Sequence, residues 1–118
     1  PIQYAVTWPD RVAGALPPLD FAKLAQLEFE APRDDVFRSL QLAREAGERC
    51  GTLPAVMNAA NEVAVEAFLA ERLGFLQITE TVEEVMERHE RIDHPGLDEL
   101  IAADHEARRM AAEVIAPQ

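Results

Sequence analysis

Three histidines are the residues in this sequence that could bind a metal ion: His89, His94 and His105. Metal sites built on helices place their ligands at short, regular spacings such as His-x-x-x-His or Glu-x-x-His. Neither pattern occurs in this chain; His94 lies in a predicted turn and His105 in a later helix. We therefore interpret the three histidines as surface or partly packed side chains, and the sequence predicts no metal site.

Five glutamates between residues 80 and 90 could form a carboxylate cluster. They share one predicted helix with an apolar stripe and lie mainly on the face opposite to it. Charged residues opposite an apolar stripe are typical of a solvated helix face. The sequence favours that interpretation over a functional cluster for Glu80, Glu83, Glu84, Glu87 and Glu90.

A nucleophilic thiol and a nucleotide-binding loop are two further chemistries that the sequence could encode. The single cysteine, Cys50, has Arg49 beside it but no histidine nearby in the sequence, which favours an incidental thiol. The five glycines never approach the spacing of a G-x-G-x-x-G or P-loop motif. No nucleotide-binding fingerprint is present, and we predict no catalytic, cofactor-binding or metal-binding residue in this chain.

Two asparagines, Asn58 and Asn61, precede Glu62 on one predicted helix and allow two interpretations. They could face a ligand or the edge of an active site. They could instead attach the N-terminal segment, or a neighbouring domain, to the helix through backbone hydrogen bonds, which is favoured because buried amides are usually structural. Trp8 has the same two interpretations, as a substrate contact or as an anchor for a short helix.

The segment Leu53–Leu73 predicts the central helix that positions these residues. Its apolar side chains cover most of the circumference, which is typical of the buried centre of a bundle. Pro54 occupies a first-turn position where proline is tolerated, and Gly74 is predicted to be the C′ residue. The expected buried positions are Leu53, Met57, Ala60, Ala64 and Phe68.

Three more helices are predicted after residue 34. The first begins at an N-cap formed by Asp34 or Asp35, and Gly47 and Gly51 bracket the turn that follows it. The second covers about Gln77–Glu90 and the third about Leu97–Ile115, with Asp104 and Arg108 paired four residues apart. Their expected buried faces are Val36, Phe37, Leu40 and Ala43; Ile78, Val82, Val85, Met86 and His89; and Leu97, Leu100, Ile101, Asp104, Arg108, Ala111 and Ile115.

Residues 1–33 differ from the rest and predict an arm. A short helix, Ile2–Trp8, ends at Pro9, and the glycine and prolines of residues 9–18 indicate an extended linker. Leu27–Phe29 alternates apolar and charged residues and predicts one lone strand, an edge that awaits another chain segment. The predicted fold is mainly α: a four-helix bundle over residues 34–118, with an N-terminal extended arm over residues 1–33.

Composition limits the partners of this fold. Eleven basic and twenty-two acidic residues give a formal charge of −11, which opposes binding to nucleic acid or to anionic membranes. No apolar run reaches the length of a membrane span, and no signal-peptide pattern is seen. One cysteine is typical of a reducing compartment, so the cytoplasm is the expected location.

Six segments of the chain, in this order and spacing, resemble one enzyme family, 1-deoxy-D-xylulose 5-phosphate reductoisomerase. They match its C-terminal part across nearly all 118 residues. The most specific are PIQYAVTWP and the NAANE-x-A-V-x-x-F-L run. The full set is PIQYAVTWPDR, LDF, LEFEAP, LQLAREAG, LPAVMNAANEVAVEAFL and LDELIAADHEAR.

The resemblance implies a homodimeric, NADPH-dependent enzyme that uses Mg²⁺ or Mn²⁺ to form 2-C-methyl-D-erythritol 4-phosphate in non-mevalonate isoprenoid biosynthesis. It implies that the metal, phosphate and cofactor sites lie upstream of Pro1, in catalytic and NADPH-binding domains that are this segment's partners. The bundle would brace the catalytic domain, with the arm between them and Leu27–Phe29 added to the catalytic sheet. The alternative is an independent acidic helical module that binds another protein.

Overall fold

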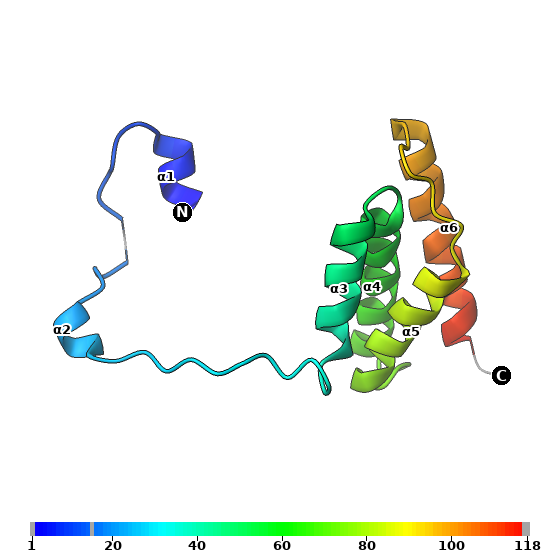
Figure 1. The fold of residues 1–118 in the computed structure, drawn as a ribbon, viewed down its shortest axis with the longest axis horizontal. Helices are drawn as coiled ribbons and strands as arrows, with labels where there is room; N and C mark the ends of the chain where they lie inside the picture. The colour runs from blue at the N-terminus through cyan, green and yellow to red at the C-terminus, as the bar shows by residue number, and fades with distance from the viewer. Residues whose placement is uncertain (1, 15, 117–118) are drawn as a thin grey trace. The chain divides into compact units, whose positions relative to one another are not determined.

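The computed structural model describes residues 2–14 and 16–116, and every regular element in those ranges is a helix (Figure 1). This confirms the mainly α fold class. The chain divides into two compact units, Pro1–Pro32 and Arg33–Gln118. The first holds α1 and α2, and the second is a bundle of α3–α6. The bounds are α1 Ile2–Thr7, α2 Phe21–Leu24, α3 Arg38–Arg49, α4 Leu53–Leu69, α5 Phe75–Arg88 and α6 Leu97–Ile115.

Helix α4 is the centre of the bundle, as the sequence predicts. It contacts α3, α5 and α6, and α5 also contacts α3 and α6. Its interior positions are mostly alanine, so neighbouring helix backbones can approach closely. The buried residues of α4 are Leu53, Val56, Ala59, Ala60, Ala64 and Ala67.

The other three helices complete one core around α4. Helix α3 contributes two buried side chains, while α5 and α6 contribute four each. Aliphatic and alanine side chains dominate this core, with no aromatic residue among those buried in the described chain. The buried residues are Leu42 and Ala46 from α3, Thr81, Val82, Val85 and Met86 from α5, and Ala103, Ala107, Met110 and Ala111 from α6.

The predicted buried face of α6 is wrong for most of its residues. Only Ala111 of that stripe is buried, whereas Leu97 is 72% and Ile101 48% exposed. The buried face carries Ala103 and Ala107, because small residues allow close packing where α6 meets the alanine-rich α4. The larger apolar residues of α6 therefore lie on neighbouring faces.

The end of the central helix also differs from the prediction. Helix α4 stops at Leu69 rather than Leu73, and Glu71 adopts a left-handed backbone with φ of 58°. Gly74 is not the C′ residue of α4 but the N-cap of α5, and its N–H donates to the Gln77 side chain at 2.8 Å. Phe68, expected in the core, is 36% exposed because it lies at this end of the bundle.

The start of the bundle is corrected in a similar way. Helix α3 begins at Arg38, and Phe37 occupies its N-cap with no side-chain hydrogen bond, so neither Asp34 nor Asp35 caps it. Gly47 lies inside α3. The turn is made by Cys50 and Gly51, which have φ of 53° and 64°, and a Cβ atom on Gly51 would lie 2.1 Å from the carbonyl oxygen of Ile92.

In the first unit the short helix is found, but the predicted strand is not. The described residues contain no strand, and Leu27–Phe29 has no regular structure. A strand is stabilised by hydrogen bonds to a neighbouring strand, and this unit supplies none. Trp8 makes an edge-on contact with Tyr4 at 5.8 Å between ring centroids, which supports its interpretation as an anchor for α1.

Candidate functional site

The histidines, glutamates and cysteine that were considered for metal binding or catalysis are dispersed over the bundle. His94 and His105 are exposed, and within residues 2–14 and 16–116 no three His, Cys, Asp or Glu side chains gather closely enough to hold a metal ion. These residues therefore do not fit a magnesium or manganese site. Cys50 is exposed, and its thiol donates to the carbonyl oxygen of Gly47 at 3.0 Å.

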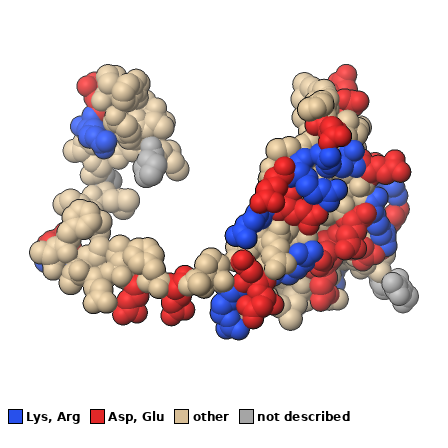
Figure 2. Space-filling view, viewed as in Figure 1, with Lys and Arg blue, Asp and Glu red and all other residues tan. Residues whose placement is uncertain are grey.

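The glutamates of α5 are divided between ion pairs and solvent. Glu83 accepts from Arg38 Nε on α3 at 2.7 Å, and Glu84 pairs with Arg88 one turn further along α5. Glu80 and Glu87 of α5 are exposed, as is Glu90, which lies beyond the end of the helix at Arg88. Figure 2 shows acidic and basic side chains interspersed over the visible face of the bundle, the pattern of a solvated, ion-paired surface.

The asparagine pair is exposed rather than buried, contrary to the expectation of a buried structural amide. Asn58 donates to Glu62 Oε1 at 2.8 Å, so its partner is a carboxylate and not the backbone of a neighbouring segment. Asn61 instead borders a groove between three helices.

Glu62 belongs to a surface network that links α4 to α6. Arg108 donates to Glu62 Oε2 at 2.8 Å and to the two carboxylate oxygens of Asp104 at 2.7 and 3.1 Å. This confirms the predicted Asp104–Arg108 pair and adds Glu62 to it. The hydrogen bond from Arg108 is the main cause that lowers the pKa of Glu62 and of Asp104 below their ordinary values. The network serves to join helices.

A polar cluster in the interior lies where the α3–α4 turn meets the α5–α6 connection. Thr52 is fully buried, and its hydroxyl oxygen accepts from the Ile92 N–H at 3.1 Å and lies 2.7 Å from His89 Nε2. The Thr52 N–H in turn donates to the Ile92 carbonyl oxygen at 3.1 Å. We call this cluster of Thr52, His89 and Ile92 the latch. Gly51 permits its close backbone approach.

His89 is half-buried in the latch, and burial is the main cause that lowers its pKa below the ordinary value. Glu106 of α6 and the adjacent Glu90 oppose that shift. Sequence reasoning placed His89 on the buried face of its helix but missed Thr52. The signal that could have identified Thr52 is its position, as a polar residue between Gly51 and the start of the central helix.

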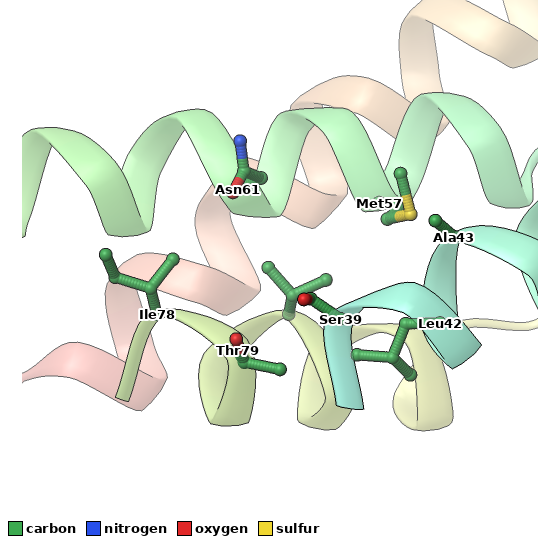
Figure 3. A pocket seen from close by; sticks show the side chains of 8 residues that line it. Ser39, Leu42, Ala43, Met57, Asn61, Ile78 and Thr79 are labelled. Atoms are coloured by element: carbon green, nitrogen blue, oxygen red, sulfur yellow. The ribbon is translucent and has the colours of Figure 1, made fainter. Parts of the chain in front are cut away.

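A small apolar groove lies between α3, α4 and α5 (Figure 3). Its volume is about 90 Å³, room for part of one side chain or a very small molecule rather than for a cofactor. Its polar groups, from Ser39, Asn61 and Thr79, have no charge to offer a ligand. The residues that line it are Ser39, Leu42, Ala43, Met57, Asn61, Ile78, Thr79 and Val82.

Exposed apolar side chains also occur at the end of the bundle where α3 and α5 begin and α4 finishes, opposite the latch (Figure 1). Phe68 and Phe75 meet there with ring centroids 5.9 Å apart, yet both remain partly or largely exposed. We call this surface the apolar end. It consists of Val36, Phe37, Leu40, Phe68, Leu69, Phe75 and Leu76, each at least 36% exposed.

Comparison with known proteins gives a consistent result. The family described as DXP reductoisomerase C-terminal domain matches residues 1–110. The 1-deoxy-D-xylulose 5-phosphate reductoisomerase of Pelotomaculum thermopropionicum is 54% identical over 115 residues, which cover 98% of this chain and 30% of that protein. The reductoisomerase of Synechococcus sp. is 48% identical over 114 residues, with 97% and 29% covered.

A solved structure agrees with the sequence relatives. The reductoisomerase of Zymomonas mobilis, in complex with NADPH, superposes with a TM-score of 0.85 at 41% identity, and the match covers 99% of this chain and 31% of that one. This chain thus spans about 30% of the length of the relatives it matches. The match of the family over residues 1–110 identifies this chain as a member of the DXP reductoisomerase C-terminal domain family.

Proposed function

We propose that this chain is the C-terminal segment of an NADPH-dependent 1-deoxy-D-xylulose 5-phosphate reductoisomerase, and that it acts there as a structural domain. The observation that carries the proposal is the match of residues 1–110 to the C-terminal domain of that family, with relatives more than three times as long. The reaction would rearrange 1-deoxy-D-xylulose 5-phosphate and reduce the product to 2-C-methyl-D-erythritol 4-phosphate.

In this proposal the catalytic and cofactor groups belong to the upstream domains, and the bundle braces them. The polar clusters of the bundle support a structural role, since the latch and the Glu62–Arg108 network join helices to one another. NADPH and Mg²⁺ or Mn²⁺ would bind upstream, where they would supply the hydride and polarise the substrate oxygens. Residues of this chain would neither transfer a proton in the reaction nor contact the substrate.

The assembly and location of the full-length protein follow from the same proposal. It would be a homodimer that works in the cytoplasm, with its upstream catalytic and NADPH-binding domains as the immediate partners of this segment. The composition supports the location, because one cysteine in 118 residues suits a reducing compartment, and the charge of −11 opposes nucleic-acid binding. None of the described helices is long and apolar enough to cross a membrane.

The test compares the 118-residue chain with the protein encoded by its whole reading frame. We expect the whole protein to oxidise NADPH when it receives 1-deoxy-D-xylulose 5-phosphate and a divalent metal ion, and the 118-residue chain to do neither this nor bind NADPH. Turnover by the chain alone would refute the structural role. An open reading frame with no upstream dinucleotide-binding domain would refute the enzyme proposal and favour the independent acidic module.

A further inference from the structure

We propose that Met57 is the methionine at which peroxide oxidises this chain. The groove between α3, α4 and α5 gives a small peroxide access to the Met57 thioether, and the same groove then holds the sulfoxide without unfolding the bundle. Oxidation at this site involves the bundle alone and does not depend on the proposed reaction.

Exposure distinguishes Met57 from the other two methionines of the sequence. Met86 and Met110 belong to the core and are only 6% and 7% exposed, whereas Met57 is half-buried and packs against that core. Met86 also borders a hollow between α3 and α5, but its side chain contributes little surface there. Oxidants reach the accessible thioethers of a folded protein first, so Met57 is the expected site.

The groove of Figure 3 is the route of the oxidant. Met57 lines the groove from α4, and Figure 3 shows its side chain, with the sulfur, turned towards Ala43 of α3. The volume of about 90 Å³ takes a few molecules of the size of water, and hydrogen peroxide is small enough to enter. Larger oxidants do not fit this space.

The chemical step is the transfer of one oxygen atom to the thioether. The lone pair of the Met57 sulfur attacks one oxygen of hydrogen peroxide, and an S–O bond forms as the O–O bond breaks. The departing hydroxide takes the proton from the transferred oxygen and leaves as water. The sulfur is oxidised by two electrons and the peroxide is reduced. Methionine sulfoxide reductases return the product to the thioether.

The groove also offers the sulfoxide oxygen the hydrogen-bond donors that a polar group needs. Asn61 lies four residues after Met57 on the same face of α4, and its amide nitrogen is a donor. The hydroxyl groups of Ser39 and Thr79 border the groove from α3 and α5. A sulfoxide on either core methionine would instead place an oxygen among apolar side chains. Met57 is therefore the methionine that the bundle tolerates in its oxidised form.

The experiment adds hydrogen peroxide to the chain that carries Cys50→Ser, since the exposed thiol would otherwise consume the oxidant. Oxidation of each methionine is followed by mass spectrometry of its peptide, and rates in denaturant correct for intrinsic reactivity. We expect Met57 to react at least roughly tenfold faster than Met86 and Met110, which become accessible only when the bundle opens. Equal rates, or faster reaction at a core methionine, would overturn the proposal.

A pair of alanine substitutions tests the route. Ala43→Leu narrows the groove, whereas Ala112→Leu makes the same change at an exposed position inside α6, away from the groove. We expect Ala43→Leu to slow the oxidation of Met57 at least about threefold and Ala112→Leu to leave the rate unchanged. An Ala43→Leu variant that reacts as fast as the Ala112→Leu control would refute the groove as the route.

Urea unfolding tests whether the groove holds the sulfoxide. We expect oxidation of Met57 to lower the urea midpoint by less than about 0.5 M, and the same treatment to leave the midpoint of Met57→Leu unchanged. Asn61→Ala removes one donor and should enlarge the fall that oxidation causes. A larger fall in the parent chain, loss of its helical signal, or an equal fall in Met57→Leu would each contradict the proposal.

Discussion

The latch makes Thr52→Val the most informative single change in the bundle. Valine keeps nearly the same shape, so packing at this fully buried position is preserved and only the hydroxyl is lost. That hydroxyl serves two partners, the Ile92 N–H at 3.1 Å and His89 Nε2 at 2.7 Å. A buried donor left without its acceptor costs about 1–3 kcal/mol, and the lost contact with His89 adds about 1 kcal/mol. We expect the free energy of unfolding to fall by about 2–4 kcal/mol.

Thr81→Val is the matched control for this prediction. Thr81 is also buried, but its hydroxyl donates to the Gln77 carbonyl oxygen at 2.8 Å within the same helix. That carbonyl already takes part in the helical hydrogen-bond ladder, so its partner is not orphaned and the expected loss is under about 1 kcal/mol.

Urea unfolding of the 118-residue chain, followed by circular dichroism, gives both values under identical conditions. Both hydroxyl groups are buried, so a difference between the two variants reports on their hydrogen-bond partners. If Thr52→Val and Thr81→Val destabilise the chain equally, within about 0.5 kcal/mol, the latch does not stabilise the fold in the way the geometry indicates.

Three further outcomes are expected from the same unfolding assay. Burial lowers the pKa of His89 in the folded state, so the unfolded state binds a proton on this side chain more readily. The contribution of neutral His89 to the free energy of unfolding is therefore complete above about pH 6.5. It is lost as the pH falls from there through the folded pKa, by at most about 1.4 kcal/mol per pH unit. His89→Asn should remove this pH dependence of the stability, whereas His105→Asn, at an exposed position, should leave it unchanged. A wild-type chain that is more stable at pH 5.5 than at pH 7.5 would contradict the lowered pKa of His89. Gly51→Ala should lower the free energy of unfolding by more than about 1 kcal/mol, since φ is left-handed there and the new Cβ atom would clash with Ile92. Gly47→Ala should raise it by about 0.5–1 kcal/mol, because Gly47 lies inside α3 and a Cβ atom there would have no atom within 4 Å. The reverse order of stability would refute this account. Phe68→Ala should cost under about 2 kcal/mol because its ring is 36% exposed; a loss of 3–5 kcal/mol would mean that Phe68 is a core residue.

Sequence periodicity predicted the helices well but their buried faces less well. The 3.6-residue repeat located α4, α5 and α6, and it gave both bounds of α6. It failed on the buried face of α6 because it ranked leucine and isoleucine above alanine. In a tightly packed bundle the innermost positions belong to side chains small enough to let two backbones approach, as Ala103 and Ala107 do.

The turn before the central helix was predicted poorly because it depends on a contact remote in sequence. Gly51 must lack a side chain because the carbonyl oxygen of Ile92, about forty residues away, lies against it, and Thr52 forms its hydrogen bonds with the same segment. Local sequence showed a glycine-rich turn, but nothing nearby specified which glycine would be essential. Gly74 lies between two helices, so a glycine there suits both the end of α4 and the start of α5. The structure makes it the N-cap of α5, where its N–H donates to the Gln77 side chain.

The position of the latch also determines how the bundle responds to mechanical load. A pull transmitted along the arm reaches the first turn of α3, a helix that buries only Leu42 and Ala46. Its far end is held by the turn that carries Thr52, so α3 would peel from its beginning towards the latch, one turn at a time. Beyond that point the load meets α4, which packs against every other helix of the bundle. We therefore expect α3 to yield to a pulling force before the rest of the bundle does.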